Sequence, residues 1–155
     1  MKKTIIIIII GTTIIVFILI FTIKAEKGSF DNLVLSNFDE SSIKTMNIIY
    51  SSQSNIITHI TSDYNTINNL IFYLNTLNLR QNYFRDNNFE DNQYRIGLYA
   101  VYDNNKDGFI MLEINNKNKI TIFFNTPTMH IEKTYKITNA EIDYNKLDEI
   151  FNMMK

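Results

Sequence analysis

The chain has 155 residues, of which 15 are lysine or arginine and 16 are aspartate or glutamate, and it contains no cysteine. The absence of cysteine excludes disulfides, thiolate zinc sites, thiol catalysis and a lipidated cysteine anchor. From Gly28 onward, 11 basic residues stand against 15 acidic ones, a net charge of about −4. This balance gives no electrostatic basis for a generic affinity for nucleic acid, so we expect no nucleic-acid partner.

The N-terminus is the most apolar part of the chain. From Ile5 to Ile23, 15 of 19 residues are Ile, Val, Leu or Phe, and none is charged. A helix of this length would be roughly 28 Å long, close to the thickness of the hydrocarbon core of a bilayer. We therefore predict that residues 1–24 are a single-pass transmembrane helix, a signal anchor with the lipid bilayer as its partner. The basic residues Lys2 and Lys3 precede the span, which predicts that the C-terminal domain lies outside the cytoplasm. The alternative is a cleaved signal and a secreted protein.

Residues 25–42 mix Gly, Ser, Asn and Asp with a few apolar residues and have no sustained periodicity. Such a composition is typical of a connecting segment, so we interpret 25–42 as a tether. The remainder, 43–155, has the length of one domain and a regular apolar pattern.

The first elements of this domain are two strands and a helix. Apolar residues alternate along 46–50 and along 56–60, with a polar loop between them, which predicts a hairpin. A helix then begins at Ser62 or Asp63, which are good N-cap residues. Its apolar residues recur at helical spacing and form one face: Ile67, Leu70, Ile71, Leu74 and Leu77.

Four more alternating runs and a final helix follow. The runs lie at 94–100, 110–114, 120–124 and 131–137, and turn-forming residues separate the later ones. The last helix begins near Asp143 and carries one apolar face. The order is ββαββββα. It predicts an α+β fold with one antiparallel sheet of about six strands and two helices packed on one face of that sheet.

The sequence "TPTMHIEKTYKI" followed by "YNKLDEIFNMM" closes this pattern. Together with the isoleucine-rich start, the pattern resembles small exported domains of unknown function on membrane-anchored proteins and lipoproteins of low-GC Gram-positive bacteria. The resemblance covers roughly 43–155 and implies no catalytic residue.

One loop has the spacing of a calcium ligand set. Asp103, Asn105 and Asp107 precede a glycine in the pattern D-x-[DN]-x-[DN]-G. A calcium loop also needs a glutamate at its twelfth position, which here is Ile114. Because the same residue types form turns between strands, we expect a hairpin turn and keep calcium as the weaker candidate.

The motifs of catalysis are missing from this sequence. The two histidines, His59 and His130, lack the spacing of a metal site, although His130 and Glu132 share one face of a strand. There is no nucleophile elbow and no glycine-rich phosphate loop. We therefore expect no catalytic residue, no metal and no cofactor, and a protein that is not an enzyme.

The segment Leu79–Arg95 holds all three arginines of the chain, interleaved with aromatic residues. Arginine and aromatic residues are enriched in interface hot spots. The candidate partner contacts are Arg80, Tyr83, Phe84, Arg85 and Phe89. The alternative is local packing at the open end of the core.

These observations favour a non-catalytic, membrane-tethered extracytoplasmic domain that binds a protein partner or a cell-surface ligand. The alternative is an exported hydrolase or a calcium-dependent module whose site is assembled from residues far apart in sequence.

Overall fold

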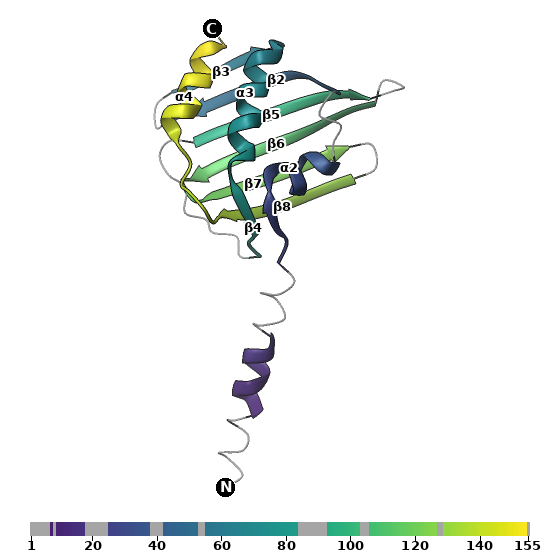
Figure 1. Cartoon of the computed structure of the whole chain (residues 1–155), viewed down its shortest axis with the longest axis vertical. Helices are drawn as coiled ribbons and strands as arrows, with labels where there is room; N and C mark the ends of the chain where they lie inside the picture. The colour runs from purple at the N-terminus through teal and green to yellow at the C-terminus, as the bar shows by residue number, and fades with distance from the viewer. Residues whose placement is uncertain are drawn as a thin grey trace.

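A computed structural model describes residues 7, 9–17, 25–37, 42–52, 55–83, 93–102, 106–126 and 129–154. Eight strands form one antiparallel sheet, and helices α2, α3 and α4 lie on the same face of it (Figure 1). The elements in chain order are β1 (Lys27–Ser29), α2 (Phe30–Leu33), the 3-10 helix η1 (Leu35–Asn37), β2 (Ile43–Ser51), β3 (Ile56–Thr61), α3 (Tyr64–Asn75), β4 (Asn78–Gln81), β5 (Gln93–Tyr102), β6 (Lys106–Asn116), β7 (Lys119–Thr126), β8 (Met129–Ile137) and α4 (Tyr144–Met153).

The strands lie in the order β1-β4-β8-β7-β6-β5-β2-β3. The middle of the sheet is a meander, because β5, β6, β7 and β8 are joined in sequence and pair in sequence. The hairpin β2–β3 extends this meander at one end, and the short strands β4 and β1 extend it at the other. The two edges of the sheet are therefore β1 and β3.

The hydrophobic core lies between the sheet and the helices. Asp63 caps α3, since its carboxylate accepts hydrogen bonds from Thr66 N at 2.9 Å and from Thr66 Oγ1 at 2.6 Å. From that start, Leu70 and Leu74 are turned onto the sheet and have no exposed surface. Asp143 caps α4 in the same way, and the Tyr94 hydroxyl on β5 donates to Asp148 of α4. Caps and one buried face thus fix both helices on the sheet.

The segment before β2 belongs to the domain. The composition of residues 25–42 predicts a tether, but β1, α2 and η1 lie in this stretch. Phe30 and Val34 are completely buried and Leu35 nearly so. The Glu26 carboxylate also holds Lys133 Nζ on β8 at 2.8 Å. The first described residues of the domain are therefore part of its core and its sheet.

The α+β class agrees with the structure, but the predicted sheet of about six strands in the order ββαββββα is wrong. The sheet has eight strands, because β4 and β1 extend it beyond β8. β4 pairs with β8 at Leu79, Arg80 and Gln81, and β1 pairs with β4. Both extra strands are too short to show an alternating pattern of their own.

The prediction of a single-pass transmembrane helix over Ile5–Ile23 is also wrong. Within the described ranges, no helix has the length and apolar character needed to cross a membrane. The helix described in this part of the chain covers residues 9–17. Its large apolar side chains are 53 to 62% exposed, as Ile14 and Phe17 show.

Candidate binding face of the sheet

The sheet has one face covered by helices and one face that they leave uncovered, which we call the open face (Figure 1). Side chains alternate between the two faces along each strand. On β8, Tyr135 and Ile137 are buried on the helix side, so the exposed Lys136 belongs to the open face. The register of the ladders then assigns every residue opposite Lys136 to the open face as well.

Four cations lie directly opposite one another across the open face. Lys27 on β1 pairs with Arg80 on β4. Arg80 pairs with Lys136 on β8, and Lys136 pairs with Lys119 on β7. Because neighbouring strands lie about 4.8 Å apart, the four positions span about 14 Å. We call this set the cation row.

The described strand neighbours of the cation row, on the same face, carry no charge. Two positions along the strands, the same-face neighbours are Ser29 on β1, Asn78 on β4, Thr134 on β8 and Thr121 on β7. Within the described part of the chain, no carboxylate forms an ion pair with Lys27, Lys117 or Lys136. Arg80 and Lys119 make further interactions within the protein.

The acidic residue next to Lys27 in sequence makes contacts elsewhere. Glu26 lies next to Lys27 in sequence, but its carboxylate accepts from Lys133 Nζ at 2.8 and 2.9 Å and from the Tyr135 hydroxyl at 3.3 Å. Burial, together with the charge of Glu26, raises the pKa of Tyr135 above its usual range. Because Tyr135 is on the helix side, Glu26 is directed away from the cation row.

Another cation of the open face, Arg95, lies opposite an acidic residue. Arg95 on β5 lies opposite Glu113 on β6, and Arg95 Nη2 is 2.8 Å from Glu113 Oε1. This is the opposite-charge pair that usually stabilises two neighbouring strands. The contrast shows that the cation row is a local departure from the charge pairing of the same sheet.

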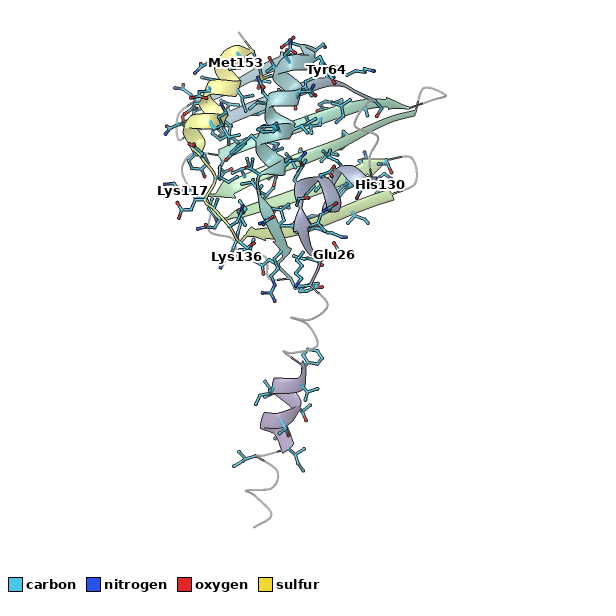
Figure 2. The ribbon with its side chains drawn as sticks, viewed as in Figure 1. Glu26, Tyr64, Lys117, His130, Lys136 and Met153 are labelled. Atoms are coloured by element: carbon cyan, nitrogen blue, oxygen red, sulfur yellow. The ribbon has the colours of Figure 1, made fainter. Side chains whose placement is uncertain are left out.

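The open face becomes apolar toward the other ends of the strands. Tyr99 on β5 is 41% exposed, and its ring centroid is 6.0 Å from that of Phe109 on β6. Met111 and Phe123 lie opposite each other on β6 and β7 and are half-buried. His130 lies at this end of β8, and Lys136 lies at the other end (Figure 2).

Gly97 makes the close packing of this apolar part possible. Asn47 Nδ2 donates to the Tyr99 hydroxyl at 3.2 Å, directly over Gly97. A methyl group on Gly97 would collide with Asn47 Oδ1 and would lie 2.9 Å from Tyr99 Cε2. The Tyr99 ring therefore folds back over the strand and occupies the space that a side chain at position 97 would fill.

The structure describes two of the five candidate partner contacts. Arg80 is exposed in the cation row, and the Tyr83 side chain is 47% exposed just after β4. The other three, Phe84, Arg85 and Phe89, lie outside the described residues. The candidate contact at Arg80 is thus placed beside three lysines that the sequence pattern did not associate with it.

The calcium candidate stays untested. Asp103 and Asn105 lie outside the described residues, and Asp107 is described only as a backbone position in β6, opposite Val101. Among the residues with described side chains, no three histidine or acidic residues group as a metal site.

Both histidines occupy sheet positions. The His59 ring is half-buried on β3, with its centroid 4.4 Å from that of Phe151 on α4 in an edge-to-face contact. His130 lies opposite Asn125 on the open face, two positions from the exposed Glu132. His59 is therefore part of the packing between α4 and the sheet.

The fold and the site define an α+β protein with an eight-stranded antiparallel sheet that presents a row of cations on its open face. No protein-family model, curated protein or solved structure matches the chain. The resemblance to exported Gram-positive domains therefore stays a prediction, as does the alternative of an exported hydrolase.

Proposed function

We propose that this protein is a non-catalytic binding module for a linear polyanion of the cell surface, which it holds along the cation row. The observation that carries this proposal is the direct opposition of Lys27, Arg80, Lys136 and Lys119 across four neighbouring strands. Like charges placed directly opposite each other destabilise a sheet. An anion bound along the row would reduce this repulsion, and Lys27 and Lys136 form no ion pair with a described carboxylate.

The dimensions of the cation row favour a polymer over a small anion. One phosphate or carboxylate group reaches two adjacent positions about 4.8 Å apart, but the row extends over about 14 Å. A chain with repeated negative charges can neutralise all four cations and release their counterions. Arg80 adds a planar group with five N–H donors, which suits phosphate or carboxylate oxygens.

The N-terminal segment supports a location outside the cytoplasm. Lys2 and Lys3 precede a long run of isoleucine, which is the composition of an export signal. An exported domain meets anionic polymers of the cell envelope in preference to nucleic acid. We therefore infer a cell-surface polymer as the ligand.

The test is a comparison of four linear probes at low salt: inorganic polyphosphate, poly-L-glutamate, single-stranded DNA and neutral dextran. We expect the full chain to bind polyphosphate or poly-L-glutamate and to leave dextran unbound. Lys136→Glu should weaken binding at least about tenfold, because it replaces a positive charge by a negative one at an inner position of the cation row.

Lys146→Glu is the matched control. Lys146 lies on α4, on the covered side of the sheet, and pairs with Glu149. The Lys146→Glu substitution changes the net charge by the same amount as Lys136→Glu, and it should leave the affinity for the polyanion within about twofold of the wild-type value. Equal losses in both variants would contradict a local site, and preferential binding of DNA would contradict the cell-surface polymer.

A further inference from the structure

The β3 edge of the sheet presents unpaired backbone groups. Among the described strands, β2 alone pairs with β3. At the hairpin, Ser52 N donates to Asn55 O at 2.9 Å and Asn55 N donates to Ser52 O at 3.4 Å. Hydrogen-bonded and non-bonded pairs alternate in an antiparallel ladder. The N–H and C=O groups of Ile56, Thr58 and Ile60 are therefore directed away from β2, toward the free edge.

The composition of β3 does not protect this edge. Its sequence, IITHIT, contains no lysine, arginine, acidic residue, proline or glycine. Soluble proteins usually protect edge strands with charges, proline, bulges or a short length. The opposite edge follows that rule, because β1 has three residues and begins with Lys27. The edge at β3 is a six-residue strand that favours pairing.

Exposed apolar side chains gather at the same edge. Within the described part of the domain, eight large hydrophobic side chains from residue 25 onward are exposed, and five of them belong to this end. Ile56, Ile57 and Ile60 lie on β3 and are 74, 44 and 66% exposed. Tyr64 begins α3 and Met153 ends α4, and both lie at the end of the domain where β3 lies (Figure 2).

We propose that β3 pairs antiparallel with β3 of a second copy of this chain, about a two-fold axis that passes beside Thr58. The open-face residues of β3 read Ile56, Thr58, Ile60, which is the same in both directions. In this register Ile56 lies opposite Ile60 of the second copy, and Thr58 lies opposite Thr58 of the second copy. The outward N–H and C=O groups of these three residues then form hydrogen bonds with their counterparts.

The self-complementary pattern selects a second copy over an unrelated strand. A two-fold axis normal to the sheet keeps the helices of both copies on the same side of the joined sheet. Open-face residues of one β3 strand then lie opposite open-face residues of the other. The ends of α3 and α4 then face those of the second copy, and Tyr64 and Met153 can be covered there. Such a contact is isologous, the commonest type in soluble oligomers. The two open faces become one continuous surface, with the two cation rows at its far ends.

The experiment measures the oligomeric state of the full chain by sedimentation, in a mild non-ionic detergent that covers the exposed isoleucines of residues 9–17. The wild-type chain should sediment as a dimer. Thr58→Lys places two ammonium groups opposite each other at the axis and should weaken dimerisation at least about 100-fold. Thr58→Asp should do the same. An equimolar mixture of the two variants should form the dimer again.

Phe72→Lys is the matched control, because Phe72 is 76% exposed on α3 and lies outside the edge. This variant should remain a dimer. A monomeric wild-type chain would overturn the proposal, and so would a dimer that both Thr58 variants leave intact.

A cysteine variant keeps the test valid if the charged variants fail to fold. The chain has no cysteine, so Thr58→Cys introduces the only thiol. Directly opposed residues of a hydrogen-bonded antiparallel pair have Cα atoms about 5.5 Å apart, which a disulfide can span. Mild oxidation should cross-link the Thr58→Cys chain into a dimer. Cross-linking no greater than that of Tyr83→Cys, which is exposed at the other end of the sheet, would overturn the proposal.

Discussion

Arg80 on β4 lies directly opposite Lys136 on β8, on the face of the sheet that the helices leave uncovered. Directly opposite residues have Cβ atoms about 5 Å apart, and two like charges in such a pair repel each other. Lys136 also faces Lys119 on its other side. Arg80 and Lys136 each have a cation on both flanking strands, so the repulsion is larger at these two inner positions than at the ends of the row.

We predict that Lys136→Glu stabilises the fold by about 0.2–1 kcal/mol while it weakens polyanion binding, because it converts two repulsive pairs into attractive ones. Urea denaturation at low salt measures the change. Added salt should reduce the difference from the wild type. In Lys146→Glu, which loses an ion pair to Glu149, stability should stay the same or fall slightly. Lower stability in Lys136→Glu would show that the row is not repulsive.

Gly97→Ala should destabilise the domain by about 1–3 kcal/mol, because the new methyl group needs the space that Asn47 and Tyr99 occupy. Chemical denaturation measures the loss. The same substitution in an Asn47→Ala background should cost less, since part of the collision is removed. Gly28→Ala is the control, because a methyl group there meets its nearest atom, Leu33 Cγ, at 3.4 Å. Equal costs at both glycines would argue against the packing described for Gly97.

Stability should fall as the pH rises above about 10, the pKa of tyrosine in an unfolded chain. Burial raises the pKa of Tyr94 and of Tyr135 in the folded protein, and Asp148 and Glu26 add to the effect. The folded state therefore keeps protons that the unfolded chain releases, and this contribution to stability is present below pH 10 and lost above it. Denaturation midpoints between pH 8 and pH 11 should show a steeper fall for the wild type than for Tyr94→Phe/Tyr135→Phe. Equal slopes would contradict the raised pKa values.

Removal of residues 1–24 should leave a folded domain, because Glu26 and everything after it in β1 and α2 is retained. Removal of residues 1–42 should prevent folding, because it deletes the fully buried Phe30 and Val34. The point substitution Phe30→Ala should cost about 3–5 kcal/mol in the longer chain. Circular dichroism and thermal melting compare the three proteins. A cooperative transition in the shorter fragment would show that the segment before β2 is dispensable.

The long elements could be predicted from the sequence because their patterns are local. The stripe that includes Leu70 and Leu74 predicts α3, and the capping role of Asp63 and Asp143 follows from the residue type. The strands β1 and β4 could not be predicted in this way. KGS and NLRQ have almost no apolar residues, and only their pairing with other strands makes them part of the sheet.

The cation row could not be found by counting charges along the chain. Lys27, Arg80, Lys119 and Lys136 come from four separate strands, and the chain as a whole has a net charge of −1. Only the register of the ladders β1–β4, β4–β8 and β7–β8 brings the four together. A test of charge at paired positions, once the strand order is known, would have found them.

The most direct test of the cation row is the salt dependence of polyphosphate binding by the full chain. A ligand that neutralises four cations should give a slope of about −3 in a plot of log K against log salt concentration. Lys136→Gln removes one cation and should reduce the magnitude of this slope by about 0.7, whereas Lys146→Gln on α4 should leave it unchanged. A slope near zero, or the same slope in the wild type and in Lys136→Gln, would contradict the assignment of the cation row as the binding site.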